Sequence, residues 1–403
     1  MNAFLLMAAV YLLAALLAAL DSALTSLELI PWFAGLRWLR VHLITLGAVT
    51  QAVFGLLPAL VARQTGQSRP AARLEIWLLL NAGLILLIAG VPAVNGTLIF
   101  GGGTLLFLAT LLLLWQLRGL RAGALVTSAP RPSGGLVFYL AGLGFLLIGI
   151  LAGTGLWLGW GGPLQMARPK EVHLHANIWG FTALVFAGLL VDIVPRVTGR
   201  AVAWPRTLPA IFWLMSGGSL LLLIAPWAGI NQLTAPGMVL MLAATLWLLL
   251  SVIVSLRGAR SIWSQPGIWH LLTAYYWVLT PVFALPVVLA VGGSANVPRA
   301  HIEQDAPQWL VYGWLLHFAY ALLPYFYRRA AHPSQPAGLG GSWFSLAAVH
   351  LGSLFFWAGI LAGEAQAALQ GAGYLFWGAS MAPILFSLWQ HMRRSVEPAG
   401  SGG

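Results

Sequence analysis

The stretch at residues 171–200 reads EVHLHANIWGFTALVFAGLLVDIVPRVTGR, an apolar segment that is long enough to cross a bilayer and begins with two histidines. Residues two positions apart lie about 200° apart around an α-helix, so His173 and His175 face nearly opposite directions. One helix can therefore offer an imidazole on each of two sides. Gly180 and Gly188 follow and flatten the helix surface, which leaves room for a broad, flat ligand.

The composition of the whole chain is that of a membrane protein. Of its 403 residues 60% are hydrophobic and only 7% are charged, too few to cover a soluble domain. Apolar runs of roughly 20 residues recur, each long enough to span the ~30 Å hydrocarbon core of a lipid bilayer. We predict an all-α polytopic protein, a single membrane domain over residues 1–403 with twelve transmembrane helices. They are expected near residues 3–20, 40–62, 75–93, 97–117, 135–160, 171–195, 207–227, 234–256, 268–292, 307–327, 343–363 and 371–391.

The net charge of +11 reflects membrane topology. With twelve spans and both termini in the cytoplasm, fifteen of the twenty Lys and Arg residues lie on the inner side, as the positive-inside rule requires. We therefore expect no nucleic-acid partner, and a multi-pass protein of a prokaryotic cytoplasmic (inner) membrane. The sequence has no cysteine, which excludes disulfides, thiolate zinc sites and cysteine-held iron–sulfur clusters.

Glycine spacing indicates an internal repeat. His42 and His175 each begin a His-x4-Gly-x7-Gly pattern, and Gly47, Gly180 and Gly313 lie at equal separations of 133 residues. We interpret this as three four-helix pseudo-repeats, over about residues 1–134, 135–266 and 267–395. The alternative is that small residues recur by composition and serve helix packing.

Three histidines near the outer ends of their spans are candidate haem ligands. Two neutral imidazoles on facing helices can supply both axial ligands of one haem iron, and Gly47 and Gly180 would let the macrocycle lie against backbone. We predict that His42 and His175 ligate one haem b. His173 is a candidate ligand of a second haem iron, or the partner of a water molecule.

Four cations precede these histidines on the expected outer side: Arg37, Arg40, Arg168 and Lys170. Arg and Lys at this level would pair with the two propionates of a haem. The alternative is that these side chains only extend to the membrane interface.

The segment His173-Leu174-His175, with Trp179-Gly180 after it, resembles the His-x-His helix of heme-copper oxidase subunit I, especially the C-family (cbb-type) enzymes. The span with Arg40, His42 and Gly47 resembles that family's second low-spin ligand helix. The resemblance implies twelve helices in three arcs, a high-spin haem on His173, a low-spin haem on His42 and His175, and an oxidoreductase. It also implies a cytochrome or cupredoxin subunit as electron donor.

Two later spans resemble that family's copper-ligand helices but lack most of its ligands. Trp314 stands where the family has a copper-binding histidine, and the histidine pair expected after Gly359 is missing. His317 and His350 are the remaining copper candidates. His270 begins its span from the cytoplasmic side, distant from the haem level, so we interpret it as a structural residue that is out of reach as a third copper ligand. We therefore expect a degenerate copper site and no stoichiometric copper.

The sequence thus predicts a haem-binding integral membrane protein for electron transfer or for diatomic-gas (O2 or NO) chemistry, in the manner of a terminal oxidase or NO reductase. The pattern Pro-x-x-Thr-Gly-Arg from Pro195 to Arg200 is also similar to NnrS membrane proteins, which implies an alternative role in the nitric-oxide response without respiratory turnover. A third hypothesis is a haem-free transporter whose histidines line a substrate or proton path. Asp192 is interpreted as a capping residue or partner of Arg196, with proton relay as the alternative.

Overall fold

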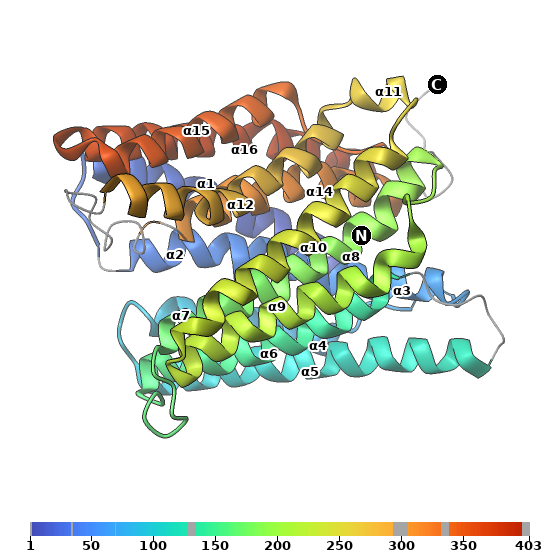
Figure 1. The fold of residues 1–403 in the computed structure, drawn as a ribbon, viewed down its shortest axis with the longest axis horizontal. Coiled ribbons are helices and arrows are strands. Elements are labelled where there is room, and N and C mark those ends of the chain that lie inside the picture. Colours follow the sequence, from blue (N-terminus) through green and yellow to red (C-terminus); the bar gives the residue numbers. More distant parts are fainter. Residues whose placement is uncertain are drawn as a thin grey trace. The chain divides into compact units, whose positions relative to one another are not determined.

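The computed structural model describes residues 2–33, 35–68, 70–126, 134–292, 305, 307–331 and 338–396. Across these ranges the regular structure is helical, and no strand occurs in them (Figure 1). Nine of the described helices are long and apolar enough to cross a membrane, and α4 (Leu74–Gly90) is a shorter apolar helix. The prediction of an all-α protein is confirmed, and the apolar helices indicate a lipid bilayer environment.

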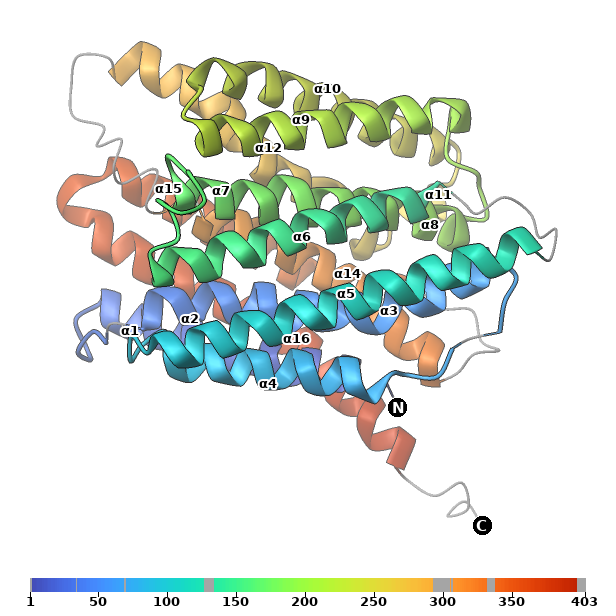
Figure 2. The same ribbon diagram turned by 90° about the horizontal axis from the view of Figure 1, so that it is seen from below.

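The helices form two compact units, which we describe separately: residues 1–53 with 261–403, and residues 54–260. In the second unit α4 packs on α5, α5 on α6, α6 on α8, and α9 on α10 (Figures 1 and 2). Gly83 and Gly102 bring α4 and α5 together, since a methyl group on Gly102 would lie 2.8 Å from the Gly83 carbonyl oxygen. This unit contains α5 Gly96–Val126, α6 Gly135–Leu158, α7 Pro169–His175, α8 Ala183–Thr198, α9 Leu208–Ala228 and α10 Thr234–Ser255. Two helices cross the division between the units, α3 Thr50–Gln64 and α11 Arg260–Trp263.

In the first unit α1 packs on α16, α15 on α16, and α12 on α14. Its helices are α1 Ala3–Ser26, α2 Leu36–His42, α12 Pro266–Gly292, α14 Leu316–Ala331, α15 Trp343–Leu361 and α16 Gln366–Val396. Short 3-10 turns lie at Pro205–Thr207, Asn231–Leu233 and Gly363–Ala365.

In the part of the chain that the structure describes, three segments of π-helix interrupt the regular helices: Leu43–Val49 (η1), Ala176–Thr182 (η2) and Leu310–Leu315 (η5). A π segment holds one extra residue per turn and is frequent at functional sites. In two of them a threonine hydroxyl binds the carbonyl five residues earlier: Thr50 donates to Thr45 and Thr182 to Asn177, both at 2.8 Å. The side chains thus support the wider turn. Each segment contains one of the equally spaced glycines, Gly47, Gly180 or Gly313.

An aromatic side chain from the preceding long helix fills the space beside each of these glycines. A methyl group on Gly47 would lie 2.7 Å from Tyr11, and one on Gly313 would lie 2.7 Å from Trp277. A methyl group on Gly180 would overlap the Phe145 ring. The room that we expected for a flat cofactor is therefore occupied by protein on this side of the helices.

Of the nine candidate spans, the two that carry π segments are the most buried. In the most apolar 18-residue stretch of Pro169–Thr198, 94% of the residues are buried. In that of Leu36–Gln64, 72% are buried. The corresponding share for the other seven candidate spans is 39–56%, as expected for helices with one face toward lipid. The histidines of these helices therefore lie on interior elements.

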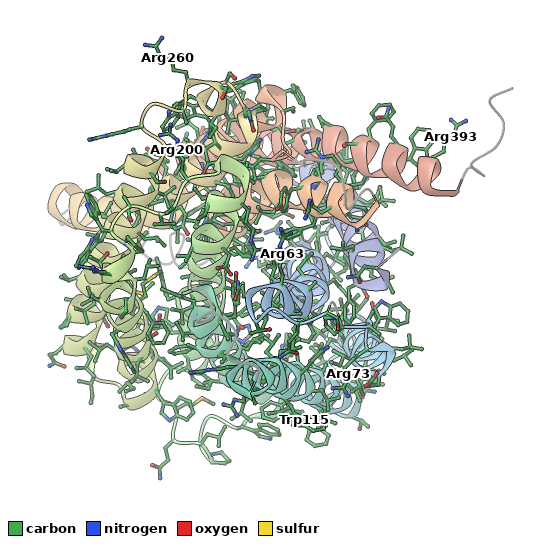
Figure 3. The ribbon with its side chains drawn as sticks, turned by 90° about the vertical axis from the view of Figure 1, so that its right-hand side faces the viewer. Arg63, Arg73, Trp115, Arg200, Arg260 and Arg393 are labelled. Atoms are coloured by element: carbon green, nitrogen blue, oxygen red, sulfur yellow. The ribbon has the colours of Figure 1, made fainter. Side chains whose placement is uncertain are left out.

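Arginines gather at one end of the helices of the second unit. Figure 3 looks onto this end, where Arg63 lies in the last turn of α3, Arg73 precedes α4 and Arg200 follows α8. Arg73 pairs with Glu75 at 2.6 Å and lies 5.8 Å from the ring centre of Trp115. Arg200 donates a hydrogen bond to the carbonyl of Arg257. Flanking cations of this kind are typical of a membrane–water boundary.

Candidate functional site

His173 lies at the end of α7 and binds the backbone of α6. Its Nδ1 is 2.8 Å from the Gly149 carbonyl oxygen, and because a carbonyl only accepts, Nδ1 carries the hydrogen. The close approach requires glycine, since a methyl group on Gly153 would lie 2.5 Å from His173 Nδ1. Asn177 Nδ2 donates to the His173 carbonyl at 2.9 Å. The sequence of α6 therefore determines how this ring is held.

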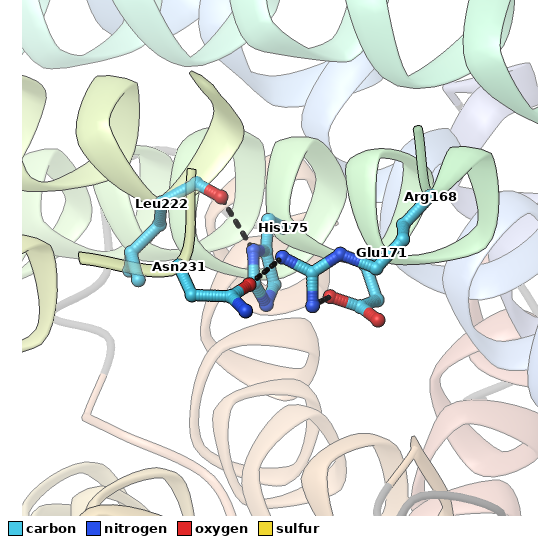
Figure 4. Close-up of polar contacts among 5 residues, drawn as sticks. All are labelled: Arg168, Glu171, His175, Leu222 and Asn231. Atoms are coloured by element: carbon cyan, nitrogen blue, oxygen red, sulfur yellow. Dashed lines mark hydrogen bonds and ion pairs between the residues drawn. The ribbon is translucent and has the colours of Figure 1, made fainter. Parts of the chain in front are cut away.

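His175 binds the backbone of a different helix, α9. Its Nδ1 donates to the Leu222 carbonyl of α9 at 2.6 Å (Figure 4). His173 thus faces α6 and His175 faces α9, which confirms that the two rings face in different directions. Near His175, Arg168 pairs with Glu171 at 3.0 Å and donates to Asn231 Oδ1 at 2.6 Å.

His42 ends α2 in the first unit. Its Nδ1 donates to the Trp38 carbonyl at 2.8 Å, and the two rings stack with centroids 4.3 Å apart. Nearby Arg40 is buried, with its guanidinium 4.7 Å from the ring centre of Tyr374, and its carbonyl accepts a hydrogen bond from Tyr312 at 2.9 Å. These contacts fix the start of the helix that leads into η1.

Of the four cations predicted to face propionates, Arg40 is therefore packed against aromatic rings and Arg168 is held by Glu171 and Asn231. Arg37 lies 5.9 Å from the ring centre of Trp32, and Lys170 is exposed. All four lie within a few residues of a candidate ligand.

The three candidate haem ligands share one protonation pattern. His42, His173 and His175 each donate from Nδ1 to a backbone carbonyl, which leaves the lone pair of the neutral ring on Nε2. Histidines that bind metals usually donate their other ring hydrogen to a carbonyl or carboxylate, which orients the ring and raises its basicity. The donor set therefore fits axial ligation of a haem iron. His42 belongs to one unit and the pair His173 and His175 to the other.

A second group of histidines, His270, His317 and His350, meets inside the first unit. The Nδ1 atoms of His270 and His317 are 2.7 Å apart, and the rings of His317 and His350 have centroids 4.7 Å apart. His270 and His317 are fully buried. The expectation that His270 lies far from the other two is wrong.

The reason is the path of the chain before α15. The Gly340 amide donates to the Ala321 carbonyl at 2.8 Å, so Gly340 lies beside a point about ten residues, or ~15 Å, before the end of α14. Gly267, at the start of α12, abuts Gly340. The first turns of α12 and α15 therefore lie near the level of Ala321, one turn from His317.

Both ring nitrogens of His350 have partners. Trp277 Nε1 donates to His350 Nδ1 at 3.0 Å, so Nε2 carries the hydrogen and donates to Thr273 Oγ1 at 3.0 Å. Within the described residues, no group of three or more His, Asp or Glu side chains is arranged to hold a metal ion. His317 and His350, the copper candidates, therefore do not turn free lone pairs toward a common ion.

Asp192 lies inside α8 and connects helices. Its Oδ2 accepts hydrogen bonds from the Tyr139 hydroxyl of α6 at 2.6 Å and from the side-chain amide of Gln64 of α3. Gly135 makes room for the carboxylate. The interpretation of Asp192 as a helix cap is therefore wrong, because α8 continues to Thr198. Sequence reasoning missed these partners, since no spacing connects residues so far apart in the chain.

No protein-family model matches this sequence, and no curated protein matches it either.

Proposed function

We propose that this protein is a haem-binding integral membrane protein that carries out electron transfer or diatomic-gas chemistry as an oxidoreductase. His42 and His175 are the axial ligands of one haem b, and His173 is the candidate ligand of a second haem iron. The observation that carries the proposal is the common hydrogen-bond pattern, in which Nδ1 of each ring donates to a backbone carbonyl and the lone pair of the neutral ring lies on Nε2.

The arrangement of the backbone supports a threefold repeat. Three π segments fall at the three equally spaced glycines, and each glycine packs against an aromatic side chain of the preceding long helix. Adding α4, α12 and α14 to the nine candidate spans gives the twelve helices that we propose to form three groups of four. Such repetition is typical of proteins built from one duplicated helical unit.

The residues around the ligands have distinct tasks. A bound haem supplies reversible one-electron chemistry and an iron that binds small gases. The carbonyls of Trp38, Gly149 and Leu222 orient the imidazoles and raise their basicity. Arg37, Arg40, Arg168 and Lys170 are the cations that pair with propionates, and Arg168 would exchange Glu171 for such a carboxylate.

The distribution of arginine supports an orientation with both termini in the cytoplasm. The proposal also includes a prokaryotic inner membrane and a cytochrome or cupredoxin as electron donor on the outer side. The test of orientation is a cysteine placed near Arg206, in a chain that has no other thiol. A membrane-impermeant reagent should leave it unmodified in intact cells. Labelling from outside would contradict the orientation.

Haem binding is tested on the full chain purified from a host that supplies haem. A pyridine haemochrome assay should show b-type haem at one or two equivalents per chain, with a six-coordinate low-spin component from bis-imidazole ligation. A protein that is folded and helical but takes up no haem under these conditions would contradict the proposal. That outcome would favour a transporter, for which the buried pair His270 and His317 provides a proton-binding element.

A further inference from the structure

The hydrogen bonds of His270 and His317 determine which nitrogen carries each hydrogen. The Ser342 carbonyl, 3.3 Å from His270 Nε2, can only accept, so His270 carries its hydrogen on Nε2. In the neutral ring Nδ1 is then a bare acceptor. His317 must therefore donate from its own Nδ1 across the 2.7 Å contact.

This leaves the lone pair of His317 on Nε2, buried and without a hydrogen-bond partner. An unsatisfied buried acceptor is costly, and in native structures such an atom usually has a function. A metal is a poor occupant, because both nitrogens of His350 are engaged and the neighbouring ring offers no second lone pair. The single buried lone pair of His317 Nε2 can instead bind a proton.

The other end of the pair approaches the surface. Ser342 is partly exposed and Gly338 is exposed, so the loop at residues 338–342 connects His270 with the outside of the helices. Gly341 has φ +88°, and any side chain there would overlap the His270 ring. The other titratable rings facing the pair are Tyr320 of α14, edge-on to His270 at 5.6 Å, and His350 of α15.

We propose that His317 and His270 form a proton relay between the buried Nε2 of His317 and the loop at residues 338–342. A proton binds His317 Nε2, the Nδ1 hydrogen of His317 passes to His270 Nδ1, and the Nε2 hydrogen of His270 leaves to a water molecule at the loop. One proton enters and one leaves, and no electrons move. The same transfers in reverse carry a proton inward. The relay does not depend on haem.

The relay is tested first on the tautomers of the full-length protein. With 15N-labelled histidine in lipid nanodiscs, imidazole spectra should show the hydrogen of His317 on Nδ1 and that of His270 on Nε2. The single variants His317→Gln and His270→Gln assign the signals. The opposite tautomers would overturn the proposal. So would stoichiometric binding of Cu2+ or Zn2+ that shifts the signals of His270, His317 and His350 together.

The second test measures how fast the His317 ring hydrogen exchanges with water. His270→Gln retains a hydrogen-bonding side chain but cannot pass a proton on, so exchange should slow by about a hundredfold, the low end of what a positioned proton-transfer group contributes. His350→Gln is the control and should leave the rate unchanged, because His350 lies outside the relay. An unchanged rate in His270→Gln would overturn the proposal.

A pair of loop variants covers the case in which His270→Gln does not fold. Gly341→Ala should displace the His270 ring and slow exchange, whereas Gly338→Ala, where the nearest atom to an added methyl group is 3.9 Å away, should not. Equal rates in these two variants would overturn the proposal.

Discussion

The helix that runs through α7, η2 and α8 and the helix formed by η5 and α14 share a backbone design but place histidine differently. Each has a π segment, and each packs the glycine of that segment against an aromatic ring. In the first helix, His173 and His175 come before the π segment and bind backbone carbonyls of two neighbours. In the second, His317 comes after the segment, binds another histidine, and retains a bare nitrogen.

In these two helices, the histidines before the π segment bind backbone carbonyls, whereas the histidine after it binds a second imidazole. A ring oriented by a carbonyl presents a fixed, basic Nε2, which suits a metal ligand. A ring whose Nδ1 hydrogen is given to a second imidazole can pass that hydrogen on, which suits proton transfer. We therefore propose haem binding for the histidines before the π segment and proton movement for the one after it.

The largest effect is expected from changes to the glycine–aromatic packing that the two helices share. Gly180→Ala and Gly313→Ala each force a methyl group into an aromatic ring, Phe145 or Trp277, so overpacking should lower the free energy of unfolding by about 1–3 kcal/mol. Thermal unfolding in detergent measures this. Gly217→Ala on α9 is the control, since an added methyl group there meets nothing within 4 Å. Equal stability of all three variants would show that the packing does not matter.

A second change should displace His173 and leave His175 in place. Gly153→Ala places a methyl group 2.5 Å from His173 Nδ1, so the ring should lose its bond to the Gly149 carbonyl, a net loss of about 0.5–1.5 kcal/mol. The 15N signal of His173 should shift, while that of His175 stays. Gly144→Ala on the same helix, in open space, should shift neither. A shift of both signals would mean that the two rings are not held independently.

The smallest effect concerns Arg168. Glu171→Gln removes an ion pair whose side chains are 35% and 39% exposed, so stability should fall by only about 0.5 kcal/mol or less. Because Arg168 is then freer to meet an anionic group, haem retention during purification should be equal or better. A clear loss of haem in this variant would indicate that Glu171 positions Arg168 for the cofactor.

Much of the fold could be predicted from the sequence, because long apolar runs and glycine spacing determine where helices lie and where they approach each other. The opposite directions of His173 and His175 followed from helix geometry alone. The π segments could not be predicted, since a one-residue expansion leaves no periodic pattern, although Gly47, Gly180 and Gly313 marked their positions. The meeting of His270 with His317 was missed because it depends on how far the loop before α15 reaches back along α14.

The central claim is that histidines before the π segments ligate haem and that the one after does not. The most direct measurement is the absorption and electron paramagnetic resonance spectrum of haem-loaded His42→Ala, His175→Ala and His317→Ala variants. We expect either of the first two changes to abolish the six-coordinate low-spin signal, because bis-imidazole ligation fails when one axial bond is lost, and His317→Ala to retain it. A low-spin spectrum that persists in His175→Ala, or disappears only in His317→Ala, would contradict the claim.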